Sequence, residues 1–506
     1  MRSDVMIGKY AIESLTTGMY TDPFVIYREY IQNAADSIDE AIKSKTIDKS
    51  QTLIKVAIDS ANRKIVIEDN GTGLKSASAY RVLSDIGNSQ KIQGQNRGFR
   101  GIGRFSGLSY CDRLTFVTSH VDEPKQYSIT YNAEELRSLI REKTDVLTAS
   151  NAMQSVISER TNACSASSHY FRVIMEGVHP ETGLLDFDTT EHYLKAIAPV
   201  AYANAFSWAK VIHSEMKKYI RPIPEYRLVL EAQGKRAEVI KEYQDTFLLN
   251  RQAGTTDQIQ DIAFFPLVNQ KGIRIGCAWY GISSFIGTII GKEIKGLRLR
   301  SGNILIGDHT TLNTIFKDSR FNGWVVGEVF VDSAEFIPNA RRDDFEHNDA
   351  YYVLFEQLQS LAAEITKAIR TASVKRNKAL ARAVSALETA GKSAEDILKE
   401  EHITPQRKGT ASAKMAKARD MLAVPMADEL SEGIRQEALE QLDILTGKVK
   451  GASAYRALNL VSGLTKTERA LLEKIFGRII NAYDEEESER YINMTLQALS
   501  EKPPEH

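Results

Sequence analysis

The sequence lacks the features that would assign it to a membrane, a disulfide scaffold or a nucleic-acid surface. Its 506 residues include only three cysteines, which are far apart and form neither a metal-ligand pair nor a disulfide framework: Cys111, Cys164 and Cys277. No run reaches the ~18 apolar residues that a membrane span needs. Lys and Arg number 65 against 66 for Asp and Glu, so no global charge draws the chain onto nucleic acid or a membrane. We therefore expect a cytoplasmic protein that contacts no membrane.

The chain is too long for one hydrophobic core, so we expect two or three domains of an α+β protein. The first, residues 1–185, alternates helical and strand patterns. Asp22-Pro23 indicates an N-cap followed by proline at the first helical position, and apolar residues then recur at helical spacing: Tyr27, Ile31, Ala34 and Ile38. Four short runs are expected to be strands, the first two joined as a hairpin: 52–58, 64–68, 113–118 and 170–175.

The remaining sequence predicts a second α/β domain over 186–350 and a helical C-terminal region over 351–506. The second domain combines a helix over 193–219 with a strand-rich stretch over 226–332, in which 273–280 and 324–331 are the clearest strands. All three tryptophans lie there and mark a second core: Trp208, Trp279 and Trp324. The C-terminal region is suited to dimerisation or partner binding, and a linker is expected near 402–417.

The first motif is Glu29-Tyr-Ile-Gln-Asn33-Ala-Ala-Asp36. Its three polar residues are spaced four and three apart, so on a helix they project from one face. The amide oxygen of Asn33 is a hard ligand suited to Mg²⁺, and Glu29, one turn earlier, could act as base on a water molecule. The alternative is an ordinary solvated helix face.

The second motif, Asp69-Asn-Gly71-Thr-Gly73, follows an apolar strand. A carboxylate fixed there can accept a hydrogen bond from an exocyclic amine such as that of adenine, and the glycines let the backbone approach the base. The alternative is a common Asp-Asn-Gly turn.

The third motif is the loop Gly98-Phe-Arg-Gly101-Ile-Gly103. Glycines let successive N–H groups face phosphate oxygens. The loop has neither the spacing of a P-loop nor that of a dinucleotide fingerprint. The polar segment between the second and third motifs, around Gly87 to Lys91, is either a mobile lid or a surface loop.

In this order, the three motifs resemble those of the GHKL ATPase superfamily, which includes the ATP-hydrolysing chain of DNA gyrase, HtpG-type chaperones, MutL, MORC proteins and sensor histidine kinases; the HtpG-like and MORC-like branches are the most similar. The resemblance implies a GHKL (Bergerat) α/β sandwich that binds ATP and Mg²⁺, with Glu29 as catalytic base and Asn33 as metal ligand. The implied ATP-binding residues are Asn33, Asp36, Asp69, Gly71, Gly73, Gly87, Ser89, Lys91, Gly98, Arg100, Gly101, Ile102 and Gly103. Ser168 or His169 would replace a Gly-Thr of the family.

A weaker resemblance to the second domain of the chaperones covers 296–308 and 336–343. It implies that Arg342 reaches the γ-phosphate as a second catalytic residue, with Arg341 in reserve. An arginine arriving from another domain would neutralise transition-state charge and couple hydrolysis to domain closure. The alternative is a pair of exposed arginines beside Asp343 and Asp344.

Absent motifs narrow the function. The first histidine is His120, which excludes the ordinary sensor-kinase architecture, and three scattered cysteines cannot build the zinc finger of many MORC proteins. No DNA-cleaving metal motif of the gyrase or MutL type is present. We therefore expect an ATP-driven conformational clamp, homodimeric and chaperone-like, acting on a protein client.

Two alternatives stay open. One is a DNA-associated clamp of the MORC or MutL type, with anti-phage defence as its setting, because a basic run over 367–382 could follow a phosphate backbone. The other is a nucleotide-binding scaffold that does not hydrolyse ATP, against which the presence of Glu29 argues.

Overall fold

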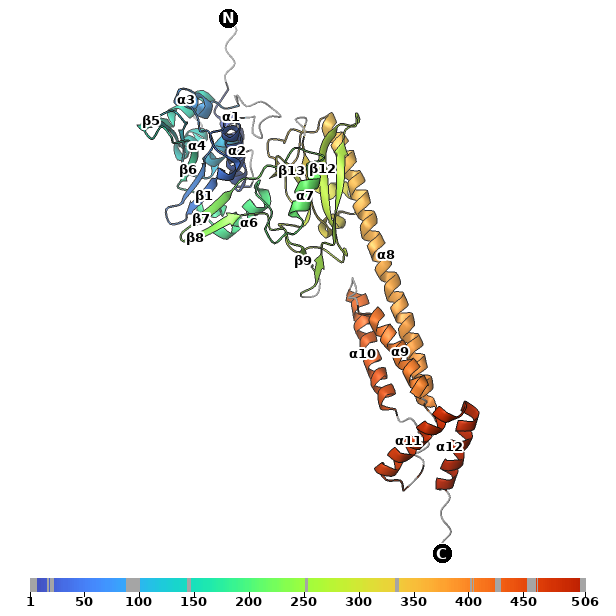
Figure 1. Ribbon diagram of the computed structural model, residues 1–506. Helices are drawn as coiled ribbons and strands as arrows, with labels where there is room; N and C mark the ends of the chain where they lie inside the picture. Colours follow the sequence, from blue (N-terminus) through green and yellow to red (C-terminus); the bar gives the residue numbers. More distant parts are fainter. Residues whose placement is uncertain are drawn as a thin grey trace. The chain divides into compact units, whose positions relative to one another are not determined.

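The computed structural model describes residues 7–15, 18, 22–87, 101–142, 147–250, 254–332, 336–400, 403, 405–423, 429–452, 461 and 463–500. The chain divides into two compact units, Met1–Lys367 and Ala368–His506. The first combines sheets and helices, and the described part of the second is helical (Figure 1). The expected α+β class is confirmed.

The first unit contains an eight-stranded sheet in the order β5-β4-β3-β6-β2-β1-β7-β8. All neighbouring strands are antiparallel except β1 and β7. The predicted hairpin and the two other predicted strands are confirmed. The strands are β1 (Ile54–Asp59), β2 (Lys64–Asp69), β3 (Arg113–Ser119), β4 (Lys125–Asn132), β5 (Ile157–Ala163), β6 (Tyr170–Glu176), β7 (Leu228–Ala232) and β8 (Lys235–Val239). Because β7 and β8 come later in the chain, the boundary expected at residue 185 falls inside this layer.

Helix α2 (Val25–Lys43) packs on this sheet against β2. The predicted apolar stripe is buried: Tyr27, Ile31, Ala34 and Ile38 are at most 3% exposed. The predicted N-terminus is wrong by two residues, because the helix begins at Val25 and the Asp22 carboxylate accepts a hydrogen bond from the Phe24 N–H (2.9 Å) ahead of the helix. The other helical elements of this layer are α1 (Tyr10–Leu15), η1 (Lys49–Gln51), α3 (Ser76–Ser84), η2 (Gly103–Ser109), α4 (Ala133–Arg141), α5 (Ala149–Ser155), η3 (Pro180–Thr182) and α6 (Phe187–Ile197).

A second sheet of the same unit has the order β11-β12-β15-β13-β14. Trp279 is its fully buried centre and packs with Tyr202, Phe206 and Tyr243, so the predicted second core is present. Its elements, with a separate β9-β10 pair, are α7 (Ala209–Met216), β9 (Thr246–Leu248), β10 (Thr256–Gln258), β11 (Asp261–Val268), β12 (Arg274–Ile282), β13 (Gly296–Ser301), β14 (Ile304–Leu305), η4 (Thr311–Ile315), η5 (Ser319–Trp324) and β15 (Val326–Val331).

The helix predicted over 193–219 is instead two helices, α6 and α7. The chain leaves the helical conformation at Ala198, whose ψ is 152°. Pro199 follows, and a residue before proline is pushed out of the helical region.

The second unit begins within α8 (Asp349–Lys399), which starts in the first unit. The segment expected as a linker near 402–417 is largely helical, since α9 spans Pro405–Met421. Its small apolar residues explain the error, because Ala411, Met415 and Ala418 bury a stripe in one cluster with Ala390 of α8 and Leu442 of α10 (Glu429–Gly451). Figure 1 shows α9 and α10 beside the C-terminal half of α8.

Two further helices complete this unit, α11 (Lys466–Ala482) and α12 (Glu485–Ser500), which pack on each other through Phe476 and Ile492. Among the residues that the structure describes, no helix combines the length and the apolar content that a bilayer span requires.

A buried group of charges fixes the second sheet to its neighbours. Glu328 of β15 accepts hydrogen bonds from Arg300 of β13, from the Lys241 ammonium (3.2 Å) and from the Tyr202 hydroxyl, and all four side chains are at most 5% exposed. Burial by itself raises the pKa of Glu328, but the charges of Arg300 and Lys241 bring that pKa down to about 2. Glu328 is therefore an ionised carboxylate inside the core.

We predict that Glu328→Ala lowers the free energy of unfolding by about 3–5 kcal/mol, because two buried cations lose their counter-charge. Urea denaturation of the full chain, followed by tryptophan fluorescence, measures the change. The matched control is Glu238→Ala, which removes an exposed carboxylate 3.4 Å from Arg227 and should cost below about 1 kcal/mol. Equal unfolding midpoints for the two variants would contradict the assignment.

Candidate active site

A cavity of about 390 Å³ opens between α2, the C-terminal end of β2 and the start of η2. Its lining brings together residues from all three sequence motifs and from the more distant predicted arginine. The predicted residues that line it are Glu29, Asn33, Asp36, Asp69, Gly73, Gly101, Gly103 and Arg342. Glu29 and Arg342, more than 300 residues apart in the sequence, thus line the same cavity.

One face of α2 supplies the acid, amide and acid of the first motif. Glu29 and Asp36 are 4% and 6% exposed, so they are not the solvated acids of an ordinary helix surface. Asn33, between them, also faces the cavity. The predicted spacing therefore holds, and it places a carboxylate and a hard oxygen ligand side by side on one wall.

Asp69 stands at the end of β2, in an otherwise apolar part of the lining. Its carboxylate is 4% exposed and accepts a hydrogen bond from the Gly71 N–H (2.9 Å). Ile67, Phe171 and Val173 lie nearby in the same wall. An acceptor among apolar side chains suits a flat, largely apolar ring that carries an amine.

The glycines of the second motif are required by close approach. Gly73 has φ 65°, and a Cβ there would lie 2.0 Å from the Ser119 carbonyl oxygen; a Cβ at Gly71 would lie 2.0 Å from the Ser37 hydroxyl. Of the two residues expected to replace the family's Gly-Thr, His169 lies with Nδ1 2.9 Å from the Gly71 carbonyl oxygen. The Ser168 carbonyl accepts a hydrogen bond from the Ser119 hydroxyl (3.0 Å).

The third motif is described from Gly101 onward. A Cβ at Gly103 would lie 1.8 Å from Oε2 of Glu29, so only glycine lets this backbone come up to the carboxylate. Three other predicted residues do not line the cavity: Gly71, Gly87 and Ile102. Ile102 directly precedes η2, and Gly87 has φ 72°. The remaining predicted residues lie outside the described part of the chain: Ser89, Lys91, Gly98 and Arg100.

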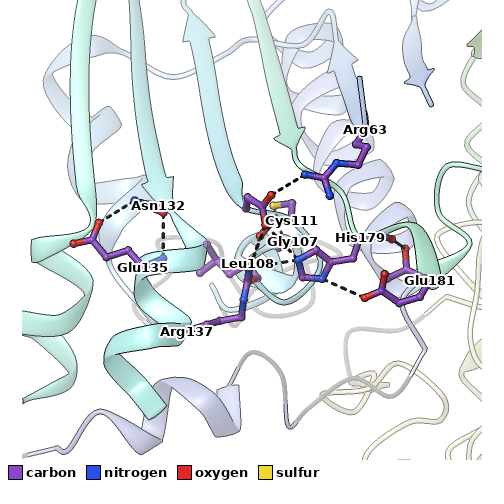
Figure 2. A network of polar contacts seen from close by, with 11 residues as sticks. Arg63, Gly107, Leu108, Cys111, Asn132, Glu135, Arg137, His179 and Glu181 are labelled. Carbon is purple, nitrogen blue, oxygen red and sulfur yellow. Dashed lines mark hydrogen bonds and ion pairs between the residues drawn. The ribbon is translucent and has the colours of Figure 1, made fainter. Parts of the chain in front are cut away.

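Polar contacts hold η2 in place at both ends. Tyr30 donates to the Arg104 carbonyl (3.0 Å) and accepts from the Gly107 N–H (3.1 Å), and burial raises the pKa of this phenol far above its ordinary value. At the far end, Arg137 of α4 donates to the carbonyls of Leu108 (2.6 Å) and Cys111 (2.8 Å), as Figure 2 shows. Neither anchor follows from a motif or a spacing in the sequence.

Arg342 enters the cavity, and its Nε donates to Oε1 of Glu29 in an ion pair. The Arg342 side chain is 11% exposed, so the alternative of an exposed arginine beside Asp343 is wrong at this position. Arg341 is exposed and lines a different cavity. Of the two predicted arginines, Arg342 is therefore the one in the site.

Arg28, which the sequence reasoning missed, supports this arrangement. Its guanidinium donates to the carbonyls of Arg342 and Gly307, each at 3.0 Å. The Gly307 N–H also donates to the Arg342 carbonyl (2.9 Å). Nothing in local sequence could reveal Arg28, because its partners lie about 280 and 310 positions further along the chain.

Comparison with known proteins bears on this site. Residues 21–166 match the family model described as histidine kinase-, DNA gyrase B- and HSP90-like ATPase. The chain is 27% identical over 140 residues to chaperone protein HtpG of Shouchella clausii (strain KSM-K16), which is 24% of this chain and 22% of that protein. It is 31% identical over 128 residues to chaperone protein HtpG of Acinetobacter baylyi (strain ATCC 33305 / BD413 / ADP1), which is 22% of this chain and 20% of that protein.

The chain thus spans about a fifth of the length of the curated relatives it matches. The matched segment runs from just before α2 through β5, and it holds the first two motifs and the third motif's glycines. This agrees with the resemblance drawn from the motifs. Residues 21–166 are therefore similar to the GHKL type of ATPase domain and to part of the HtpG chaperones.

Proposed function

We propose that this protein is an Mg²⁺-dependent ATPase that works as an ATP-driven conformational clamp, chaperone-like, on a protein client. The observation that carries the proposal is the Glu29–Arg342 pair. Glu29 comes from α2, and Arg342 comes from the segment that follows the second sheet. Both line the cavity that also holds Asn33 and Asp69. The rate of hydrolysis would therefore depend on the position of the Arg342 segment relative to α2.

The donors in the cavity fit a nucleotide and its metal. Asp69, in its apolar wall, would hold the adenine amine, and the glycine backbone near Gly101 and Gly103 would face the phosphates. The amide oxygen of Asn33 would hold Mg²⁺, which neutralises phosphate charge when bound. Most of the other metal positions would be filled by phosphate oxygens and water, as is usual for Mg²⁺.

Glu29 would orient the attacking water and accept its proton, and Arg342 would bind the transferring phosphate. In the structure these two groups are paired with each other. A γ-phosphate that attracts the guanidinium of Arg342 would free the carboxylate of Glu29 for the water. The base would therefore become available only when the triphosphate is in place.

We predict that Glu29→Gln lowers the rate of ATP hydrolysis about 10²- to 10⁴-fold, because the base is removed. Its affinity for ATP should stay close to that of the wild type, whereas Asp69→Asn should bind ATP about tenfold or more weakly through loss of a charged acceptor. Phosphate release and calorimetric ATP binding measure the two effects, and chelation of Mg²⁺ should abolish turnover of the wild type.

The control is Asp59→Asn, at the exposed turn of the β1–β2 hairpin. It should change neither the rate of ATP hydrolysis nor the affinity for ATP. If Glu29→Gln hydrolyses ATP at the wild-type rate, the role of Glu29 is refuted. If the wild type binds ATP without turnover, the scaffold alternative replaces the ATPase.

We propose dimerisation through α11 and α12, because these helices expose large apolar side chains. Leu471 and Met494 are each 59% exposed, Ile475 and Tyr491 are 41% and 43% exposed, and Tyr483, between the two helices, is 48% exposed. Contiguous apolar surface on a soluble protein is commonly an interaction site. A homodimer would let two ATPase domains pair when ATP binds.

Sedimentation velocity tests this interface. The wild type should sediment as a dimer, and Leu471→Glu with Met494→Glu should sediment as a monomer, because two buried charges oppose association. The control is Ile273→Glu, which alters an apolar residue of the first unit that is 57% exposed and should leave the dimer intact. A wild-type monomer at all concentrations, with and without ATP, would refute the proposal.

A second candidate function, the DNA-associated clamp, is favoured by one feature of α8. Its residues Lys367, Arg370, Lys375, Lys378 and Arg382 are exposed, so the basic run does lie on the surface. Such a run could contact a phosphate backbone, although the near-zero net charge slightly favours a protein client.

If the protein binds DNA in this way, replacing Lys375, Lys378 and Arg382 by Gln should weaken duplex binding and reduce the slope of log affinity against log salt by about 3. Fluorescence anisotropy of the full chain with a labelled duplex at several salt concentrations measures this slope. Lys466→Gln with Lys474→Gln, on α11, is the control. An unchanged slope in the triple variant, or no wild-type binding, would leave the protein-client function.

A further inference from the structure

A second cavity of about 610 Å³ lies in the first unit on the other side of α2. It is bounded by α2 and α6 of the ATPase side and by β13 and the loop after β14 from the second sheet. It shares no lining residue with the active-site cavity. The motifs identified in the sequence do not account for it.

Two buried arginines line this cavity. Arg298 of β13 is 1% exposed, and Arg28 of α2 is 8% exposed. Arg28 donates through its two terminal nitrogens to main-chain carbonyls, and Arg298 donates to the carbonyl of Lys292. The Nε atom of each has no hydrogen-bond partner among the described residues.

Neither guanidinium makes a direct ion pair in the part of the chain that the structure describes. No carboxylate oxygen of that part lies within 4.0 Å of Arg28 or Arg298, although buried charges are normally paired. The nearby buried carboxylate, Glu328, is taken by Arg300 and Lys241. Burial lowers the pKa of Arg298, and the more distant charges of Glu328 and Glu293 offset this lowering only in part.

The carboxylates that line the cavity already have partners of their own. Asp308 accepts from the Thr310 N–H and hydroxyl (both 2.7 Å), and Asp22 accepts from the Phe24 N–H (2.9 Å). Asp343 accepts from the Asn339 amide, and Glu293 lies 3.7 Å from the His192 ring. Further cationic side chains complete the lining: Lys292 and Arg341. The lining therefore carries as many carboxylates as Lys and Arg side chains, but Arg28 and Arg298 are its buried cations and neither makes a direct ion pair with a described carboxylate.

We propose that this cavity is a binding site for a small phosphate-bearing anion, distinct from the ATP site, with Arg28 and Arg298 as its buried donors and Lys292 at its edge. A guanidinium matches the oxygen pairs of a phosphate, and a ligand with two phosphate groups can serve both arginines at once. The volume is within the range of small-molecule pockets, so it admits an inorganic polyphosphate or a nucleotide.

Pyrophosphate is the probe, titrated calorimetrically into the full chain at fixed salt with the ATP site saturated by ADP. The wild type should bind it. Arg298→Gln should weaken binding about tenfold or more, because a charged donor is lost. Lys292 is exposed, so Lys292→Gln keeps the fold intact and should weaken binding about threefold.

Arg320→Gln is the matched control, since Arg320 is exposed and pairs with Asp318. It should bind pyrophosphate as the wild type does. A parallel titration with uridine diphosphate separates the two sources of the phosphate: equal affinity indicates an inorganic anion, and tighter binding indicates a nucleotide.

The proposal is overturned if the wild type does not bind pyrophosphate, or if neither Arg298→Gln nor Lys292→Gln weakens the binding. The titration reads binding and needs no turnover. A failure of the ATPase proposal therefore leaves this test valid, and its own failure leaves the ATPase proposal untouched.

Discussion

The ion pair between Glu29 and Arg342 is the interaction on which the arrangement of the first unit depends. Both side chains are almost fully buried, and a buried charge that loses its partner is costly. The segment that carries Arg342 is therefore held to α2 by electrostatics, and Arg28 reinforces it with hydrogen bonds to two carbonyls. The candidate site is completed only when this segment is in place.

Arg342 is also unusual in its backbone, with φ 57°. A side chain in this left-handed region costs about 1 kcal/mol or more, and such residues persist where the surroundings fix them. Here the Arg342 carbonyl accepts from Arg28 and from the Gly307 N–H. Gly307 itself has φ 66°, and a Cβ there would lie 1.9 Å from the Thr311 hydroxyl. The turn that presents Arg342 is thus fixed by the first helix of the site.

Much of the first sheet and the helices packed on it could be predicted from sequence, because the signals there are local. The apolar spacing along α2, the β1–β2 hairpin and the glycines at 73 and 103 each express a rule that acts within a few residues. What could not be predicted depends on contacts between distant segments. The addition of β7 and β8 to the first sheet and the role of Arg28 are of this kind. The helix α9 was missed because Pro405, at its first position, and Gly409 resemble a linker when burial is unknown.

Helix α2 lies between the two cavities, and two adjacent residues of it line different cavities. Successive residues of an α-helix are rotated by about 100°. That rotation turns Glu29 toward one cavity and Arg28 toward the other. One residue inserted just before Arg28 would carry its guanidinium into the place of the Glu29 carboxylate. One residue deleted there would carry the Glu29 carboxylate into the second cavity, beside Arg298. The length of the chain between Val25 and Asn33 is therefore constrained as strictly as the identity of any residue in it.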